Sequence, residues 1–146
     1  MEEYRTGKEF CSLIHALSAD LLRFELDHIR EESEEDVTLH EIHTIELIGH
    51  LKEGTMSELS RKSRVKQSTM TVMIDKLIRK GLVDRYRMDD DRRVVRVRLT
   101  GKGELLHREH DKRHQIVTDQ WLRPLSEKEQ ETLLVLLRRI TEKMDD

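Results

Sequence analysis

The chain contains 146 residues, of which 39% are charged and only 3% are aromatic, and this composition predicts one domain of amphipathic helices with solvated outer faces. No apolar run is long enough to span a membrane, and residues 1–10 lack the apolar segment of an export signal. Cys11 is the only cysteine, so an intrachain disulfide is excluded and a cytoplasmic location is expected.

The net charge of −3 conceals a basic segment. Residues 61–98 contain 13 Lys and Arg against 5 Asp and Glu, a local charge of +8, which leaves −11 for the rest of the chain. A charge run is ordinarily a solvated helix face. Because this run coincides with a helix-turn-helix pattern and a hairpin pattern, we interpret it as a surface for nucleic acid.

The first predicted element is a helix over about residues 8–30, followed by a solvated acidic loop that ends at residue 36. Cys11 lies within the apolar stripe of this helix and is predicted to be a buried packing residue. The stripe recurs at helical spacing and consists of Phe10, Leu13, Ile14, Leu17, Leu21, Phe24 and His28.

A capping box of Thr38 and Glu41 opens the second predicted helix. Gly49 is predicted to end this helix, and Gly54 to close the loop that follows. The inward positions of the helix are Ile42, Ile45 and Ile48.

A short helix, a tight turn and a longer helix follow, which is the order of a helix-turn-helix. Thr55 and Glu58 form a second capping box before the segment MSELSRKS, the turn spans 63–66, and Gly81 ends the longer helix. The apolar stripe of the longer helix is Met70, Met73, Ile74, Leu77 and Ile78. The side chains predicted to contact DNA bases and phosphates are Lys66, Gln67, Ser68, Thr69 and Thr71.

Residues 82–100 alternate apolar and charged side chains on either side of a polar tip at 89–92, a pattern that predicts an antiparallel hairpin. Two strands alone are marginally stable, so the hairpin must lean on the helix before it. The tip combines Arg92 and Arg93 with aspartates that can hold a guanidinium in place. An arginine on a thin ribbon is suited to a DNA minor groove. The helix-turn-helix and the hairpin together therefore predict a winged helix.

Thr100 is predicted to cap a fifth helix that ends near Trp121, and Ser126 with Glu129 forms a capping box that opens a sixth. These helices carry more apolar surface than one winged helix can cover, so we predict a homodimer that presents two recognition helices to a pseudo-palindromic operator. The stripe of the sixth helix is Leu133, Leu136, Leu137, Ile140 and Met144.

This order of elements, together with residues 84–103, resembles the MarR family of winged-helix transcriptional regulators over nearly the whole chain. The matching signature is Asp91, Arg92 and Arg93, followed by Leu99, Thr100 and Gly103. The resemblance implies that Arg93 enters the minor groove and that Asp91 orients it. It implies an α+β fold, mainly α with a small β-hairpin. Its single domain, 1–146, would comprise a DNA-binding lobe at 38–100 and dimerisation helices at 8–31 and 101–146.

Within the family, the segments EIHTIELIG, DDRRVVRVRLTGKG and HREHDKRH look most like the repressors of fatty-acid biosynthesis. This resemblance implies a repressor of lipid-synthesis genes. Its effector would be a long acyl chain linked to acyl carrier protein.

A second likeness, to the zinc-uptake repressors of the family, implies a zinc-responsive repressor. The positions that match their ligands are Glu25, His43, His110 and His114, a set of three imidazoles and one carboxylate that suits tetrahedral zinc. Ile42 stands where the second metal site of those repressors needs a carboxylate. The alternative is that these histidines are polar groups satisfied by hydrogen bonds.

An enzyme is the alternative from another class. The segment HDKRH has the histidine spacing of a helical metalloprotease motif, but it lacks the glutamate that serves as general base beside the first histidine. A metal-dependent enzyme is therefore disfavoured, and no catalytic residue is predicted. We therefore predict a DNA-binding regulator.

Overall fold

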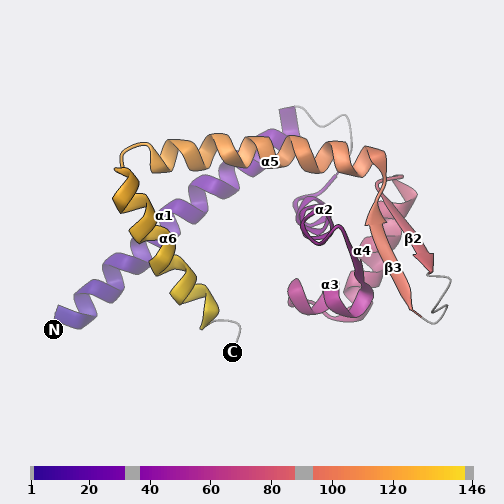
Figure 1. Cartoon of the computed structure of the whole chain (residues 1–146), viewed down its shortest axis with the longest axis horizontal. Coiled ribbons are helices and arrows are strands. Elements are labelled where there is room, and N and C mark those ends of the chain that lie inside the picture. The colour runs from indigo at the N-terminus through magenta and orange to yellow at the C-terminus, as the bar shows by residue number, and fades with distance from the viewer. Residues whose placement is uncertain (1, 32–36, 88–93, 144–146) are drawn as a thin grey trace. The chain divides into compact units, whose positions relative to one another are not determined.

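The computed structural model describes residues 2–31, 37–87 and 94–143, and the side chains of residues 2–5 and 28–31 are outside that description. The chain forms two compact units, residues 1–109 and 110–146, with the boundary inside the fifth helix. The elements of the described residues, drawn in Figure 1, are α1 (Glu2–Glu31), α2 (Leu39–Leu51), β1 (Glu53–Thr55), α3 (Met56–Lys62), α4 (Gln67–Arg79), β2 (Val83–Arg87), β3 (Val95–Leu99), α5 (Gly101–Leu122) and α6 (Glu127–Glu142).

The predicted helices and the predicted hairpin are present, and the predicted helix caps are formed. Thr38 and Glu41 close a capping box at the start of α2, as Thr55 and Glu58 do at the start of α3. Ser126 and Glu129 do the same for α6. At α5, the Thr100 hydroxyl accepts a hydrogen bond from the Gly103 amide at 3.1 Å. Each of these side chains satisfies a backbone donor that the helix itself cannot pair.

Several predicted boundaries were wrong. α1 begins at Glu2 rather than near residue 8. α2 continues through Gly49 to Leu51, and it ends where Lys52 adopts a φ of 64°. Gly54 closes no loop, because it belongs to β1 and pairs with Val97. The predicted acidic loop, the wing tip and Met144 fall on residues 32–36, 88–93 and 144–146, which are outside the described part.

Gly49 stays helical for a packing reason. A Cβ at this position would overlap the imidazole of His107 from α5, so the glycine provides the space that this ring occupies. The ring of His50 meets the His107 ring edge-on, with 5.2 Å between centroids. A glycine within a helix costs about 1 kcal/mol relative to alanine, and here close packing accounts for its presence.

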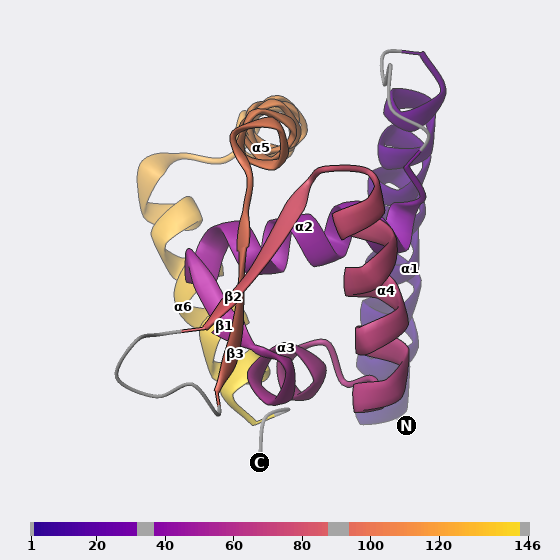
Figure 2. The same cartoon turned by 90° about the vertical axis from the view of Figure 1, so that its right-hand side faces the viewer.

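The predicted hairpin is confirmed, and a third strand extends it. β2 pairs antiparallel with β3 from Val83 opposite Leu99 to Arg87 opposite Val95, and β1 pairs with the other edge of β3, so the strand order is β1-β3-β2. Figure 2 shows the three strands lying together in front of α2. The short β1 was missed because its segment, Glu53–Thr55, has no apolar alternation.

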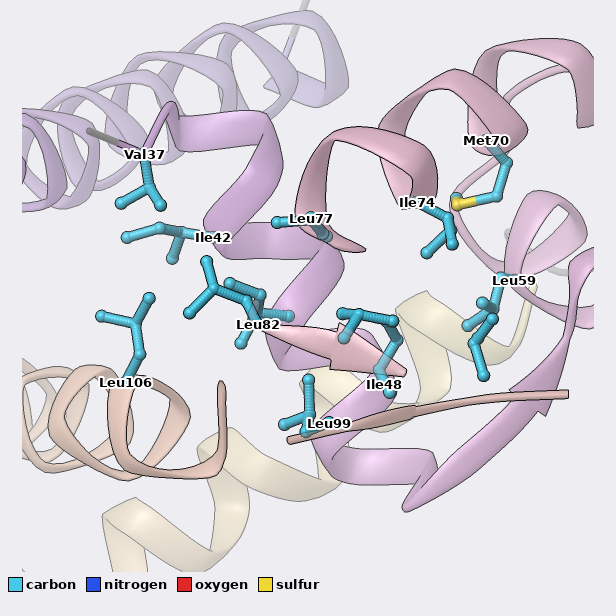
Figure 3. Close-up of a cluster of buried hydrophobic side chains, with 13 residues drawn as sticks. Val37, Ile42, Ile48, Leu59, Met70, Ile74, Leu77, Leu82, Leu99 and Leu106 are labelled. Carbon is cyan, nitrogen blue, oxygen red and sulfur yellow. The ribbon is translucent and has the colours of Figure 1, made fainter. Parts of the chain in front are cut away.

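The core of the N-terminal unit lies between α2, α4 and the sheet. Figure 3 shows its apolar side chains converging from these elements and from the start of α5. The predicted inward residues Ile42, Ile45 and Ile48 are each at most 1% exposed, which confirms the apolar face of α2. The other buried members are Val37, Leu59, Met70, Ile74, Leu77, Leu82, Val83, Val97, Leu99 and Leu106.

A partly buried ion pair joins the start of α2 to the end of α4. The Lys80 ammonium donates to the Glu41 carboxylate at 2.8 Å, and the Thr38 amide donates to the same oxygen at 2.8 Å. Burial raises the pKa of Glu41, but the hydrogen bonds from Lys80 and Thr38 outweigh it, so the pKa lies below the usual glutamate value. Glu41 therefore caps α2 and fixes the C-terminus of α4.

Glu41→Gln is expected to lower the free energy of unfolding by about 1–3 kcal/mol at neutral pH, because it removes the charge that Lys80 faces. A carboxyl with a lowered folded-state pKa stabilises the fold above its unfolded pKa of about 4.3 and loses this contribution as pH falls through the folded value. Urea denaturation should therefore give a difference between native and variant that shrinks below about pH 4.

Glu58→Gln is the matched control, since Glu58 fills the same capping-box position in α3. Glu58 is exposed, and the hydrogen bonds described for it are all with Thr55. Glu58→Gln should lower the free energy of unfolding by less than Glu41→Gln does. Equal losses in the two variants, or a Glu41 effect that does not change with pH, would show that the ion pair contributes nothing beyond the cap.

Candidate nucleic-acid interface

The helix-turn-helix is built by α3, the turn at residues 63–66 and α4. The Val65 amide donates to the Ser60 carbonyl at 3.0 Å, and Arg64 adopts a left-handed φ of 53°, so the chain reverses within a few residues. α4 buries Met70, Ile74 and Leu77 against the core. Because these residues pack against the core, the opposite face of α4 points toward solvent.

The first turn of α4 carries the predicted DNA contacts on its surface. Lys66, Gln67, Ser68 and Thr69 are exposed. Lys66 is the N-cap and makes no side-chain capping bond, and the first turn contains no acidic residue. Helix N-termini in this state attract anions through their backbone N–H groups and the helix dipole, so this end of α4 suits a phosphate.

Thr71 is half-buried, and its hydroxyl donates to the Gln67 carbonyl at 2.9 Å. That proton is used within the helix, so Thr71 offers a methyl group and oxygen lone pairs rather than a donor. Thr69 is exposed but also lines a cavity between α2 and α4.

This cavity, of about 330 Å³, lies behind the first turns of α4. Its apolar lining comes from Leu47, Val65, Met70 and Met73. Its polar lining residues are His40, His43, Thr44, Lys62, Ser63 and Thr69. A ligand here would touch the recognition helix from its inner side.

The strands of the wing carry arginines with defined partners. Arg85 donates from Nη2 to Asp75 Oδ1 of α4 at 2.8 Å, and Arg96 donates from Nη1 to Glu53 Oε1 of β1 at 2.9 Å. The Tyr86 hydroxyl donates to the other Glu53 oxygen, and this bond raises the pKa of Tyr86. Arg98 stacks on the Tyr86 ring, with Cζ 4.9 Å from its centroid.

These contacts involve two residues that the sequence analysis did not assign. Glu53 falls in the unpredicted β1, where it bridges Tyr86 of β2 and Arg96 of β3. Asp75 lies on the predicted recognition helix, and only the fold brings it opposite Arg85. The predicted tip residues Asp91, Arg92 and Arg93 lie outside the described residues.

The predicted metal ligands form two pairs, one in each unit. His43 Nε2 lies 3.3 Å from Glu25 Oε1 in the N-terminal unit. In the C-terminal unit the rings of His110 and His114 lie one helical turn apart, with 4.2 Å between centroids. Ile42 is buried in the core. A four-ligand zinc site stays a prediction.

Cys11 was predicted to be buried, and it is exposed in the described chain, with His15 Nδ1 at 4.0 Å from its sulfur. The apolar neighbours along α1 are exposed too: Phe10, Leu13, Ile14 and Leu17. The prediction was wrong for the single chain because nothing in the described residues covers this face of α1. Helical periodicity identifies an apolar stripe without identifying what covers it.

Comparison with known proteins identifies the family of this arrangement. The MarR family model matches residues 37–95, the segment from just before α2 to the first residue of β3. FabT of Streptococcus pneumoniae, in a crystal structure in complex with DNA, is 29% identical with a TM-score of 0.86, and the match covers 95% of this chain and 97% of FabT. The chain belongs to the MarR family. It is a winged helix-turn-helix, DNA-binding transcriptional regulator.

Other relatives of this MarR-family protein agree. A MarR family protein of Bacillus stearothermophilus is 27% identical with a TM-score of 0.82, over 97% of both chains. The HTH-type transcriptional regulator PchR of Bacillus subtilis (strain 168) is 27% identical over 124 residues, which are 80% of this chain and 73% of PchR. The family consists of transcriptional regulators rather than enzymes. In the described residues, no helix of this MarR-family chain is long and apolar enough to cross a membrane.

Proposed function

We propose that the chain is a homodimeric repressor that binds a pseudo-palindromic operator and changes its DNA affinity when it binds an effector. The observation that carries the proposal is the exposed first turn of α4, which has Lys66 at its N-cap, no acidic residue and no side-chain capping bond. Lys66 would contact a phosphate, and Gln67 and Ser68 would read base edges in the major groove.

The wing tip would enter the adjacent minor groove. Arg92 and Arg93 supply the guanidinium groups, and Asp91 would orient the one that is inserted. The wing strands that carry this tip are anchored to α4 through Arg85 and Asp75. The likeness to FabT, whose structure was solved in complex with DNA, supports this mode of binding.

Assembly as a dimer is supported by apolar surface on the terminal helices. α6 buries none of its residues, although it contains a run of apolar side chains from Leu133 to Leu137. α1 exposes Phe10, Leu13 and Leu17 in the same way. Apolar faces of this size mark interaction sites, and a two-fold dimer would present two copies of α4 to the two half-sites.

Fatty-acid synthesis genes are the proposed targets, because FabT, which is similar to this chain over 95% of its length, is a fatty-acid repressor. The effector would be a long acyl chain carried by acyl carrier protein. The cavity behind α4 supports this choice, since an apolar ligand against Met70 and Met73 would bear directly on the recognition helix. A ligand that prefers one position of α4 shifts the population toward it.

A zinc-responsive repressor is the second candidate. The contact between Glu25 and His43 favours it, and so does the close pairing of His110 and His114. Each pair offers ligand types that zinc prefers. Bound zinc would select the DNA-competent arrangement of the dimer.

The two effectors are separated by one titration. Affinity for duplexes selected from a random library should change at least about fivefold when long-chain acyl carrier protein is added, a typical allosteric coupling. Zinc buffered from trace to micromolar levels should have no such effect. A zinc response that is lost in His110→Ala but kept in His15→Ala would instead establish the second candidate and refute the acyl proposal.

A further inference from the structure

A groove separates the recognition helix from the wing. It has a volume of about 470 Å³ and is lined by Met56, Thr71, Arg85, Tyr86, Arg87 and Val95. None of these lining residues is acidic, and two are arginines. We call this hollow, with these six lining residues, the α4–wing groove. Its two arginines and its position between the two elements proposed to contact DNA indicate an anionic occupant.

The geometry of B-DNA indicates which anion this is. A sugar-phosphate strand separates each major groove from the neighbouring minor groove. If α4 lies in the major groove and the wing tip in the adjacent minor groove, as proposed above, the strand between the two grooves must cross the space between α4 and the wing. We propose that the α4–wing groove binds this strand, with Arg85 and Arg87 as its phosphate contacts.

Arg85 and Arg87 lie on the side of the sheet that faces the α4–wing groove. They pair with Val97 and Val95 of β3, so both arginines share the sheet face that packs toward α4. Arg98 pairs with Asp84 and belongs to the opposite face. Arg87 is exposed, and its guanidinium can donate two parallel hydrogen bonds to a phosphate.

Asp75 has a positioning role in this inference. An acid beside a phosphate strand would ordinarily weaken DNA binding through repulsion. Here its Oδ1 accepts from Arg85 Nη2 at 2.8 Å, and both side chains are substantially exposed, so the pair contributes little to stability. One carboxylate occupies only part of the five-donor guanidinium. Asp75 therefore holds Arg85 across the groove and leaves N–H groups for phosphate oxygens.

The inference rests on the proposed mode of DNA binding and is tested by anisotropy titrations between 50 and 200 mM salt. The duplexes are one selected from a random library and one scrambled sequence. Arg87→Ala should weaken binding to both by a similar factor, about tenfold, and should lower the salt slope by about one. Arg87→Glu should weaken both further. Gln67→Ala should weaken binding to the selected duplex only.

Arg98→Ala is the matched control, because it removes the same charge from the other face of the sheet and should have a smaller effect. Asp75→Asn separates the two possible roles of Asp75. The affinity for DNA falls if Asp75 positions Arg85, and it rises if Asp75 only repels DNA. Equal effects of Arg87→Ala and Arg98→Ala, with an unchanged salt slope, would overturn the inference while native DNA binding stands. Absence of DNA binding by the native chain would overturn the proposed function as well.

Discussion

Gly103→Ala is expected to lower the free energy of unfolding by about 3 kcal/mol, the upper part of the range for overpacked sites. A Cβ at Gly103 would overlap the carbonyl oxygen of Leu82, which is backbone and cannot rotate away. The same oxygen accepts from the Thr100 amide at 3.1 Å, and the Thr100 hydroxyl donates to the Gly81 carbonyl at 2.7 Å. The start of α5 is thus packed directly on the backbone between α4 and β2.

Gly101→Ala provides the control on the same helical turn, since a Cβ there meets no atom within 4 Å. Alanine is a better helix former than glycine, so this variant should be as stable as the native chain or slightly more so. Urea denaturation of the two variants measures the difference. Equal stability of the Gly103→Ala and Gly101→Ala variants would mean that α5 can move away from the Leu82 carbonyl without loss of stability. Close packing would then not explain why Gly103 is a glycine.

The second large effect is expected from the double variant Leu133→Asp and Leu137→Asp. These leucines lie one turn apart on α6 and are exposed in the single chain, so aspartates there should not disturb the fold. In the proposed dimer they would place charges in an apolar interface. The chain should then sediment as a monomer at micromolar concentration, and its affinity for the selected duplex should fall by at least about 100-fold, the usual range for losing a linked second site.

Val135→Asp is the matched substitution on α6. Val135 is exposed as well, but it lies outside the predicted apolar stripe, about half a turn from both leucines. This variant should remain dimeric and should bind the duplex as the native chain does. A folded double variant that stays dimeric, or a monomeric native chain with full affinity, would refute the predicted interface.

Most of the fold could be predicted because its local signals agree. Capping boxes at Thr38, Thr55 and Ser126 mark three helix starts, and alternation from Leu82 to Leu99 marks the hairpin. Boundaries failed where distant residues decide them. Gly49 resembles a helix end in sequence, yet it remains helical because His107, far along the chain, fills the space beside it.

The candidate site was predictable in type but not in its connections. The spacing of Met70, Ile74 and Leu77 fixes which face of α4 turns outward, and so identifies Gln67 and Ser68. Contacts across elements carry no local signal. Asp75 and Arg85 lie ten residues apart, Glu53 and Arg96 forty-three, and only the packed sheet brings these charges together. Residues that hold the wing in place were therefore missed.

In the proposed function, α4 and the wing read DNA together in a symmetric dimer. Selection of duplexes from a random library by the native chain, followed by affinity measurement with Arg93→Ala, tests it most directly. We expect an enriched inverted repeat with half-site centres about one helical turn, or a multiple of it, apart, and a loss of about 1–3 kcal/mol of binding free energy in the variant. Enrichment of no inverted repeat, or equal affinity of native chain and variant for the enriched sequence, would contradict it.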